Sequence, residues 1–122
     1  MNFNKLNNKP KYQFIKNFSY ALSGLKDLIL NEVSFRLELF FFFFMSIFIP
    51  YLNETFNHKL ILFLSLFLPI FSEIVNSAIE RIVDLITLEY SEQAKRSKDV
   101  GSTLVLFSFF LVFLIWGFIL YY

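Results

Sequence analysis

The stretch SEIVNSAIERIVD, residues 72–84, lies between two long apolar segments and decides how the chain is interpreted. LILFLSLFLPIF, residues 60–71, precedes it, and LVLFSFFLVFLIWGFILYY, residues 104–122, ends the chain. The stretch carries polar residues at intervals of three or four positions: Glu73, Asn76, Glu80 and Asp84. Charged side chains are rare in membrane helices because removing them from water is costly, so their presence here needs an explanation.

The four polar residues fall on one side of a helix. With a turn of about 100° per residue, the other three lie within about 60° of Glu73. The opposite side is apolar and carries Ile74, Val75, Ala78, Ile82 and Leu85. Pairing with Arg81, Arg36 and Lys98 is the purely structural explanation of these acids. Because Glu32 and Asp99 are expected at a similar depth, the polar groups exceed what pairing requires, and we expect a functional site.

Composition places the chain in a membrane. Of its 122 residues, 57% are hydrophobic and 19 are Phe, which argues against a soluble globular domain. The length fits one domain over residues 1–122, and the net charge of +1 offers no basic surface for nucleic acid. The absence of Cys excludes disulfide bonds, thiol catalysis and zinc–thiolate sites. The first 30 residues lack the apolar core of a signal peptide.

Three segments approach the roughly 20 apolar residues that a helix needs to cross a bilayer. They are residues 34–52, 60–86 and 99–122, and the second qualifies only if the polar stripe lies within or just above the membrane. Before them, residues 12–30 place apolar side chains on one face of a helix and polar ones on the other. Such a helix lies in the membrane interface. We therefore predict an all-α membrane protein with an amphipathic surface helix and three transmembrane helices.

The distribution of Lys and Arg predicts the orientation, because cytoplasmic loops carry an excess of both. Residues 1–26 hold five lysines, whereas the turn at residues 53–59 holds only Lys59. The connection at residues 87–98 holds Lys95, Arg96 and Lys98. We therefore expect the N-terminus and the second connection in the cytoplasm, and the first turn and the C-terminus on the outer side.

The polar set suits phosphoryl transfer. Two carboxylates can hold Mg²⁺ together with substrate phosphates, and a third can accept a proton from a hydroxyl. A Lys beside an Asp can contact a nucleotide, and phosphoryl transfer depends mostly on positioning and charge neutralisation. The chain contains only three Gly and neither GxxxxGK[ST] nor GxGxxG, so both common ATP-binding loops are excluded. Spacing alone leaves an unorthodox kinase and a proton-coupled or metal transporter as alternatives.

Five motifs carry a resemblance to a known family. They are ExxNSAIExxxD at residues 73–84, EY at 89–90, KDVGS at 98–102, NEVSFRLE at 31–38 and YALSGL at 20–25. Over residues 13–118 the chain resembles the small bacterial membrane diacylglycerol kinases. The resemblance implies a homotrimer of this fold, with sites shared between chains, in the bacterial inner membrane. It also implies transfer of the ATP γ-phosphate to a lipid alcohol at the cytoplasmic face, with Mg²⁺, in phospholipid recycling.

The resemblance assigns roles by position. Glu73 resembles the catalytic base and Asn76 a residue that orients the site, while Glu32 and Glu80 resemble metal ligands. The implied nucleotide-binding residues are Gln13, Tyr20, Glu32, Glu80, Glu89, Tyr90, Ser91, Lys98 and Asp99. The implied lipid-substrate contacts are Lys16, Arg36, Glu38, Glu73, Ser102 and Trp116. Gln13 departs from the family, which often has an Arg there, and Lys16 lies one turn along, where its charge can compensate.

Two branches of the family use different lipids. The undecaprenol branch tends to read AKDAAAGAV near the nucleotide site, whereas this chain reads SKDVGSTLV at residues 97–105. That segment and NEVSFRLE favour diacylglycerol, with phosphatidic acid as the product, and undecaprenol is the alternative. A small proton or ion conductor is the non-enzymatic alternative, since intramembrane acids alone permit it. The acids cluster between Glu73 and Asp99, at one end of the bundle, which favours the kinase.

Overall fold

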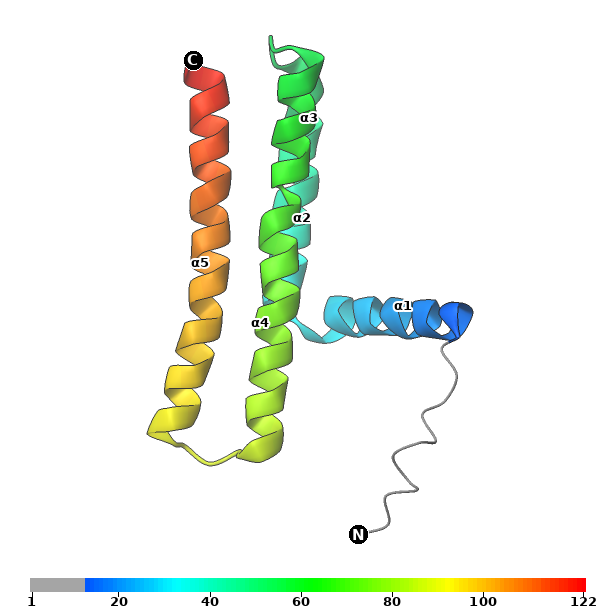
Figure 1. The fold of residues 1–122 in the computed structure, drawn as a ribbon, viewed down its shortest axis with the longest axis vertical. Helices are drawn as coiled ribbons and strands as arrows, with labels where there is room; N and C mark the ends of the chain where they lie inside the picture. The colour runs from blue at the N-terminus through cyan, green and yellow to red at the C-terminus, as the bar shows by residue number, and fades with distance from the viewer. Residues whose placement is uncertain (1–12) are drawn as a thin grey trace.

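The structure, a computed structural model, describes residues 13–122, which contain helices and no strand. The elements are α1 (Phe14–Asn31), α2 (Val33–Phe48), the short 3₁₀ helix η2 (Ile49–Tyr51), α3 (Phe56–Ser65), α4 (Phe67–Ile86) and α5 (Glu92–Tyr121). Figure 1 shows α2, α3, α4 and α5 upright and side by side, with α1 projecting sideways from the bundle. The predicted start of the surface helix, residue 12, lies outside the described residues.

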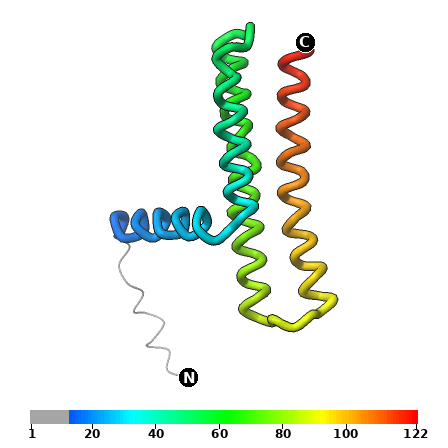
Figure 2. The backbone as a smooth tube through the Cα atoms, turned by 180° about the vertical axis from the view of Figure 1, so that it is seen from behind, coloured from blue at the N-terminus to red at the C-terminus, as the bar shows by residue number. Residues whose placement is uncertain are grey.

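Helix α1 has the exposure expected of a helix at a membrane interface. Leu28 is its only buried residue, and apolar side chains such as Phe14, Ile15 and Phe18 are exposed. The helix ends where Glu32 adopts an extended backbone and donates its N–H to the carbonyl of Leu28. Only Glu32 separates α1 from α2, so the chain turns sharply from the surface helix into the first upright helix (Figure 2).

Three spans are long and apolar enough to cross a membrane: Val33–Tyr51, Phe56–Ile86 and Glu92–Tyr121. The predicted surface helix and three transmembrane helices are therefore confirmed. The last helix begins earlier than residue 99, because Ser91 Oγ accepts a hydrogen bond from the Ala94 N–H and caps it. Its first two turns are polar, so hydropathy alone does not reveal them. Lys95, Arg96 and Lys98 consequently lie on α5 and not in a loop.

The second span is interrupted between α3 and α4 at Leu66, although residues 60–86 were expected to form one helix. Pro69 explains the interruption, because proline has no N–H for the carbonyl of residue 65 and its ring clashes with that group. The span also begins before residue 60, because Thr55 Oγ1 accepts a hydrogen bond from the His58 N–H and caps α3.

The apolar core lies at the end of the bundle remote from α1 (Figure 1). It contains Phe42, Ile49, Leu62, Leu66, Val112, Trp116 and Ile119. Other phenylalanines of the run at residues 40–44, such as Phe40 and Phe43, are exposed. Only 22% of the windows in the first and third spans is buried, so much apolar surface is left for lipid or another chain. Polar side chains occupy the interior at the other end of the bundle.

Candidate active site

The polar stripe of α4 turns into the bundle, as the helical periodicity predicts. Glu73 is 4% exposed, Asn76 6% and Ser77 2%, whereas Ile74, Val75, Ile82 and Leu85 on the opposite side are exposed. The stripe leaves the interior towards its C-terminal end, where Glu80 is half-buried and Asp84 is exposed. The buried part of the stripe therefore begins with the predicted base and ends near the predicted metal ligand.

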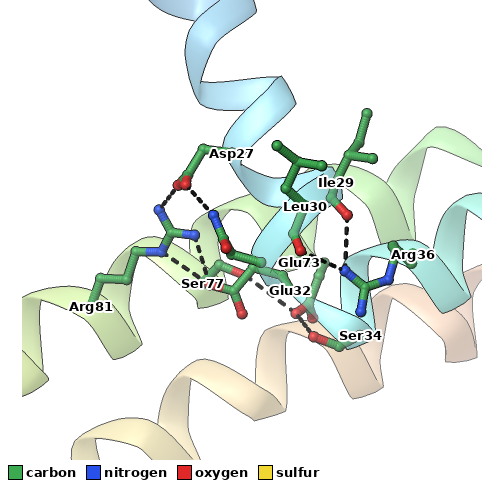
Figure 3. A network of polar contacts seen from close by, with 10 residues as sticks. Asp27, Ile29, Leu30, Glu32, Ser34, Arg36, Glu73, Ser77 and Arg81 are labelled. Carbon is green, nitrogen blue, oxygen red and sulfur yellow. Dashed lines mark hydrogen bonds and ion pairs between the residues drawn. The ribbon is translucent and has the colours of Figure 1, made fainter.

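Two serine hydroxyls hold the Glu73 carboxylate. Ser34 Oγ, on α2, donates to Glu73 Oε1 at 2.5 Å, and Ser77 Oγ, one turn along α4, donates to the same oxygen at 3.3 Å. Figure 3 shows Ser34, Ser77 and Glu73 together. No Lys or Arg forms an ion pair with Glu73 among residues 13–122. Glu73 is therefore a buried carboxylate that neutral hydroxyl groups hold in place.

Asn76 sits where α5 comes closest to the stripe. Its Nδ2 donates to Glu80 Oε1 at 3.4 Å, while its Oδ1 is buried without a hydrogen-bond partner in the part of the chain described. A Cβ atom at Gly101 would lie 2.6 Å from that Oδ1, so the absence of a side chain on α5 makes room for the amide. Glu80 has no ion-pair partner among the described residues. Glu80, which is half-buried, therefore retains capacity to bind a ligand, whereas the Asn76 oxygen is an enclosed acceptor without a donor among the described residues.

Arg81 joins the surface helix to the stripe. Its Nε and Nη2 donate to Glu32 Oε1 at 3.0 and 2.8 Å, and its Nη1 donates to Asp27 on α1 (Figure 3). Hydrogen bonds from Arg81 and then from Asn31 lower the pKa of Asp27 below its ordinary value. Ion pairs with Arg81 thus neutralise Asp27 and Glu32. Asp84 forms an ion pair with Lys98 at 2.7 Å. Structural pairing within the described residues explains neither Glu73 nor Glu80.

A cleft between the ends of α4 and α5 collects five of the nine predicted nucleotide contacts. It has a volume of about 370 Å³, and its lining includes Glu89, Tyr90, Ser91, Lys98 and Asp99. The same cleft contains Asp84, Thr87 and Lys95, which were not predicted. Lys95 pairs with Asp99 at 2.9 Å, so the cleft combines both charge signs. A polar cleft at the tip of the bundle is accessible to a soluble nucleotide.

The remaining predicted nucleotide contacts lie elsewhere in the chain. Glu32 lies between α1 and α2, and Glu80 lies on α4 outside the lining of the cleft. Gln13 precedes the first residue of α1, and Tyr20 lies on the N-terminal half of that helix, together with the predicted lipid contact Lys16. This half stands away from the bundle (Figure 1). Tyr20 is 61% exposed. A helix rises by about 1.5 Å per residue, so a single chain holds these side chains well away from its own α4–α5 cleft.

Three of the predicted lipid contacts lie towards the end of the bundle that carries α1 and the α4–α5 connection. Near α1, Glu38 is buried within electrostatic range of Glu73, and its Oε2 lacks a hydrogen-bond partner among the described residues. Arg36 Nη1 donates to the carbonyls of Ile29 and Leu30 at the end of α1 (Figure 3). Ser102 Oγ, on α5 near the cleft, donates to the carbonyl of Lys98.

Trp116 does not join this group. It is buried in the apolar core, where its Nε1 donates to Ser65 Oγ at 3.1 Å. It follows Ser102 by about four helical turns of α5, so the structure places the two at different depths. A lipid contact by Trp116 stays a prediction, and the described contact is structural.

Sequence reasoning assigned no role to Ser34, Ser77 or Asp27, and it treated Arg81 only as a neutralising charge. Ser34 and Ser77 lie inside the quoted motifs NEVSFRLE and NSAIE, but periodicity does not show that they meet at Glu73. Only the packing of α2 against α4 reveals that contact.

The described residues contain no group of three or more His, Asp or Glu side chains arranged to hold a metal ion. Mg²⁺ is commonly bound through one or two carboxylates and substrate phosphates, so such a group is not required. Glu80, half-buried and free of ion pairs among the described residues, suits this mode of binding. Glu32 suits it less well in a single chain, because Arg81 occupies one of its oxygens.

Comparison with known proteins identifies the family. The sequence profile of the family described as prokaryotic diacylglycerol kinase matches residues 19–120. The chain is 35% identical to a diacylglycerol kinase of Haemophilus influenzae, covering 88% of this chain and 92% of that protein. It is 33% identical to a diacylglycerol kinase of Escherichia coli strain K12, covering 89% of each. A diacylglycerol kinase of Sinorhizobium sp is 39% identical over 69% of this chain.

These matches cover nearly all the described helices, and the non-enzymatic alternative of a proton or ion conductor is set aside. Together with three segments long and apolar enough to span a membrane, they show that the chain is a membrane kinase that belongs to the prokaryotic diacylglycerol kinase family.

Proposed function

We propose that this protein transfers the γ-phosphate of ATP to the hydroxyl of diacylglycerol and produces phosphatidic acid and ADP. The observation that carries the proposal is that α4 carries both a buried carboxylate, Glu73, and, about three helical turns further on, residues that line a polar cleft. The carboxylate suits a lipid hydroxyl that arrives from the membrane, and the cleft suits a charged nucleotide that arrives from water. Similarity to proteins named diacylglycerol kinase supports the choice of lipid.

In the proposed reaction, Glu73 accepts the proton of the lipid hydroxyl. The hydroxyl oxygen then forms a bond to the γ-phosphorus, and the bond from that phosphorus to the β,γ-bridging oxygen breaks to release ADP. Lys98 and Asp99 at the cleft contact the nucleotide, and Asn76 orients the groups between the cleft and Glu73. Such a reaction needs positioning and charge neutralisation more than covalent chemistry.

A role for Mg²⁺ is consistent with the donor set. Glu80, on α4, offers carboxylate oxygens. Glu32, between α1 and α2, accepts a hydrogen bond from Arg81, the residue that follows Glu80. When bound with ATP, the metal neutralises charge on the phosphates. Glu80 would hold it from α4, and Glu32 would do so if Arg81 kept only its bond to Asp27.

We also propose that the protein is a homotrimer whose sites are shared between chains. The support is that the N-terminal half of α1, with Tyr20, projects away from its own bundle (Figure 2). A neighbour's α1 placed over the stripe would bring Tyr20 to the nucleotide.

The proposed orientation puts the active site on the cytoplasmic side of the inner membrane, with the C-terminus outside. In Figure 1, α1 and the α4–α5 connection lie towards one end of the bundle and the C-terminus lies at the other. Lys95, Arg96 and Lys98 lie at the first end, and this supports the proposal because cytoplasmic segments carry an excess of basic residues.

The test is phosphorylation by the purified protein in mixed micelles with Mg²⁺ and radiolabelled ATP. Diacylglycerol and undecaprenol are offered in separate reactions, and Glu73→Gln serves as the control for contaminating kinases. We expect labelled phosphatidic acid from diacylglycerol and none from the control. Label on undecaprenol alone would correct the substrate, and label on neither lipid would refute the proposed reaction.

A further inference from the structure

The Glu73 carboxylate is held in an asymmetric way. Ser34 from α2 and Ser77 from α4 both donate to Oε1, and no described residue donates a hydrogen bond to Oε2. A glutamate needs such bonds to be oriented, because rotation of its terminal carboxylate has broad, roughly two-fold energy wells. Two donors on one oxygen set that rotation and leave the other oxygen for a proton.

The two donors differ in how firmly they are tied to Glu73. Ser77 lies one turn along the same helix, where a serine hydroxyl can instead bond to the backbone of its own helix. Ser34 comes from another helix, 39 residues away in the sequence, and its contact is the shorter one. Ser34 therefore couples the direction of the carboxylate to the position of α2.

The position of Ser34 is itself fixed by the turn from α1 into α2. Arg36 Nη1 bonds to the carbonyls of Ile29 and Leu30, on the α1 side of the turn. Arg81 bonds to Glu32, the residue between the two helices. Figure 3 shows these contacts around Ser34 and Glu73. The turn thus presents Ser34 to α4 as a part of a connected polar network.

We propose that Ser34, assisted by Ser77, is a positioning residue that turns Glu73 so that Oε2 meets the substrate hydroxyl. The inference rests on the proposed function, in which Glu73 accepts the hydroxyl proton. A general base must come within about 2.6–3.2 Å of the group it deprotonates. A misplacement of about 1 Å can lower a rate by about 10²-fold, so a freely rotating carboxylate is a poor base.

The main experiment compares Ser34→Ala with Ser34→Thr, which keeps the hydroxyl. Ser34 is exposed, so its truncation opens no cavity in the core. Ser46→Ala is the matched control on α2, because the Ser46 hydroxyl bonds only to the Phe42 carbonyl in the described chain. The measurements are kcat and the KM for Mg-ATP in mixed micelles containing diacylglycerol, together with the midpoint of thermal unfolding.

We expect Ser34→Ala to lower kcat by about 10-fold to 100-fold, with the KM for Mg-ATP and the unfolding midpoint close to those of the wild type. Ser34→Thr should recover most of kcat, and Ser46→Ala should behave as the wild type. If Ser34→Ala does not fold, Ser34→Cys gives the same comparison, since a thiol is a much weaker donor. Wild-type kcat in a folded Ser34→Ala or Ser34→Cys variant would overturn the inference.

A double variant separates this inference from the proposed function. If Ser34 acts through Glu73, adding Ser34→Ala to Glu73→Gln should cause no further loss of kcat. An equal loss in both backgrounds would show that Ser34 acts independently of Glu73 and would overturn the inference. Substantial activity in Glu73→Gln itself would instead refute the base role in the proposed function.

Discussion

Adding one methyl group at Gly101 should lower activity much more than it lowers stability. A Cβ atom at this position would lie 2.6 Å from Asn76 Oδ1 and 3.5 Å from Ile79 Cδ1 and Cγ2. Ordinary non-bonded contacts are about 3.5–4.0 Å, so Gly101→Ala requires the methyl group and the Asn76 amide to separate by about 1 Å. Because Oδ1 ends a flexible side chain, we expect the amide to move before the helices do.

The cost in stability should be modest. Overpacking a well-packed contact destabilises a protein by about 1–3 kcal/mol, whereas replacing a helical Gly by Ala stabilises the helix by about 1 kcal/mol. Gly117→Ala on the same helix is the control, because a Cβ atom there has nothing within 4 Å. Gly101→Ala should therefore be less stable than Gly117→Ala by about 1–3 kcal/mol in reversible unfolding from micelles.

The loss of activity should be much larger than the loss of stability. Displacing Asn76 by about 1 Å disturbs its bond to Glu80 and its proposed orienting role, and such a shift can cost about 10²-fold in rate. The assay is kcat for diacylglycerol phosphorylation, with Gly117→Ala expected to match the wild type. Full activity in Gly101→Ala would refute the reasoning, since it would mean that the position of Asn76 is unimportant or that α4 and α5 are further apart.

Four further outcomes are expected. Glu73→Gln should lower kcat by about 10² to 10⁴ with little change in Mg-ATP affinity, as steady-state kinetics can show, because a general base contributes about that much. Glu80→Gln should weaken Mg-ATP binding and be partly restored by higher Mg²⁺, whereas Asp84→Asn should matter less; normal binding by Glu80→Gln would exclude it as a metal ligand. The pKa of Asp27 is lowered by its hydrogen bonds, so its contribution to stability is present above the ordinary value of 3.8 and is lost as pH falls through its lower folded pKa. Unfolding measured between neutral and acid pH should show this loss in the wild type but not in Asp27→Asn. Co-refolding Glu73→Gln with Tyr20→Ala, if the latter is inactive alone, should restore activity in mixed trimers, and a mixture that stays inactive despite cross-linked mixed trimers would place both residues of a site in one chain.

The sequence alone determined the helices and their polar side. Apolar runs long enough to span a bilayer predict helices, because only helices and closed barrels satisfy the backbone in lipid. The turn of about 100° per residue placed Glu73, Asn76 and Glu80 on one face, and the burial of Glu73 and Asn76 confirms it. Sequence hydropathy failed at Glu92, where a serine cap starts the helix in polar residues, and at Pro69, where one predicted helix became two.

The contacts of the polar face follow from how the helices pack against one another. Ser34 reaches Glu73 across 39 residues, and Arg81 reaches Glu32 across 49 residues, through the packing of separate helices. The approach of Gly101 to Asn76 depends in the same way on how α5 lies along α4. Periodicity specifies the direction of a side chain around its own helix axis. It carries no information on the crossing angle and the axial shift between two helices, and those two quantities determine which side chains touch.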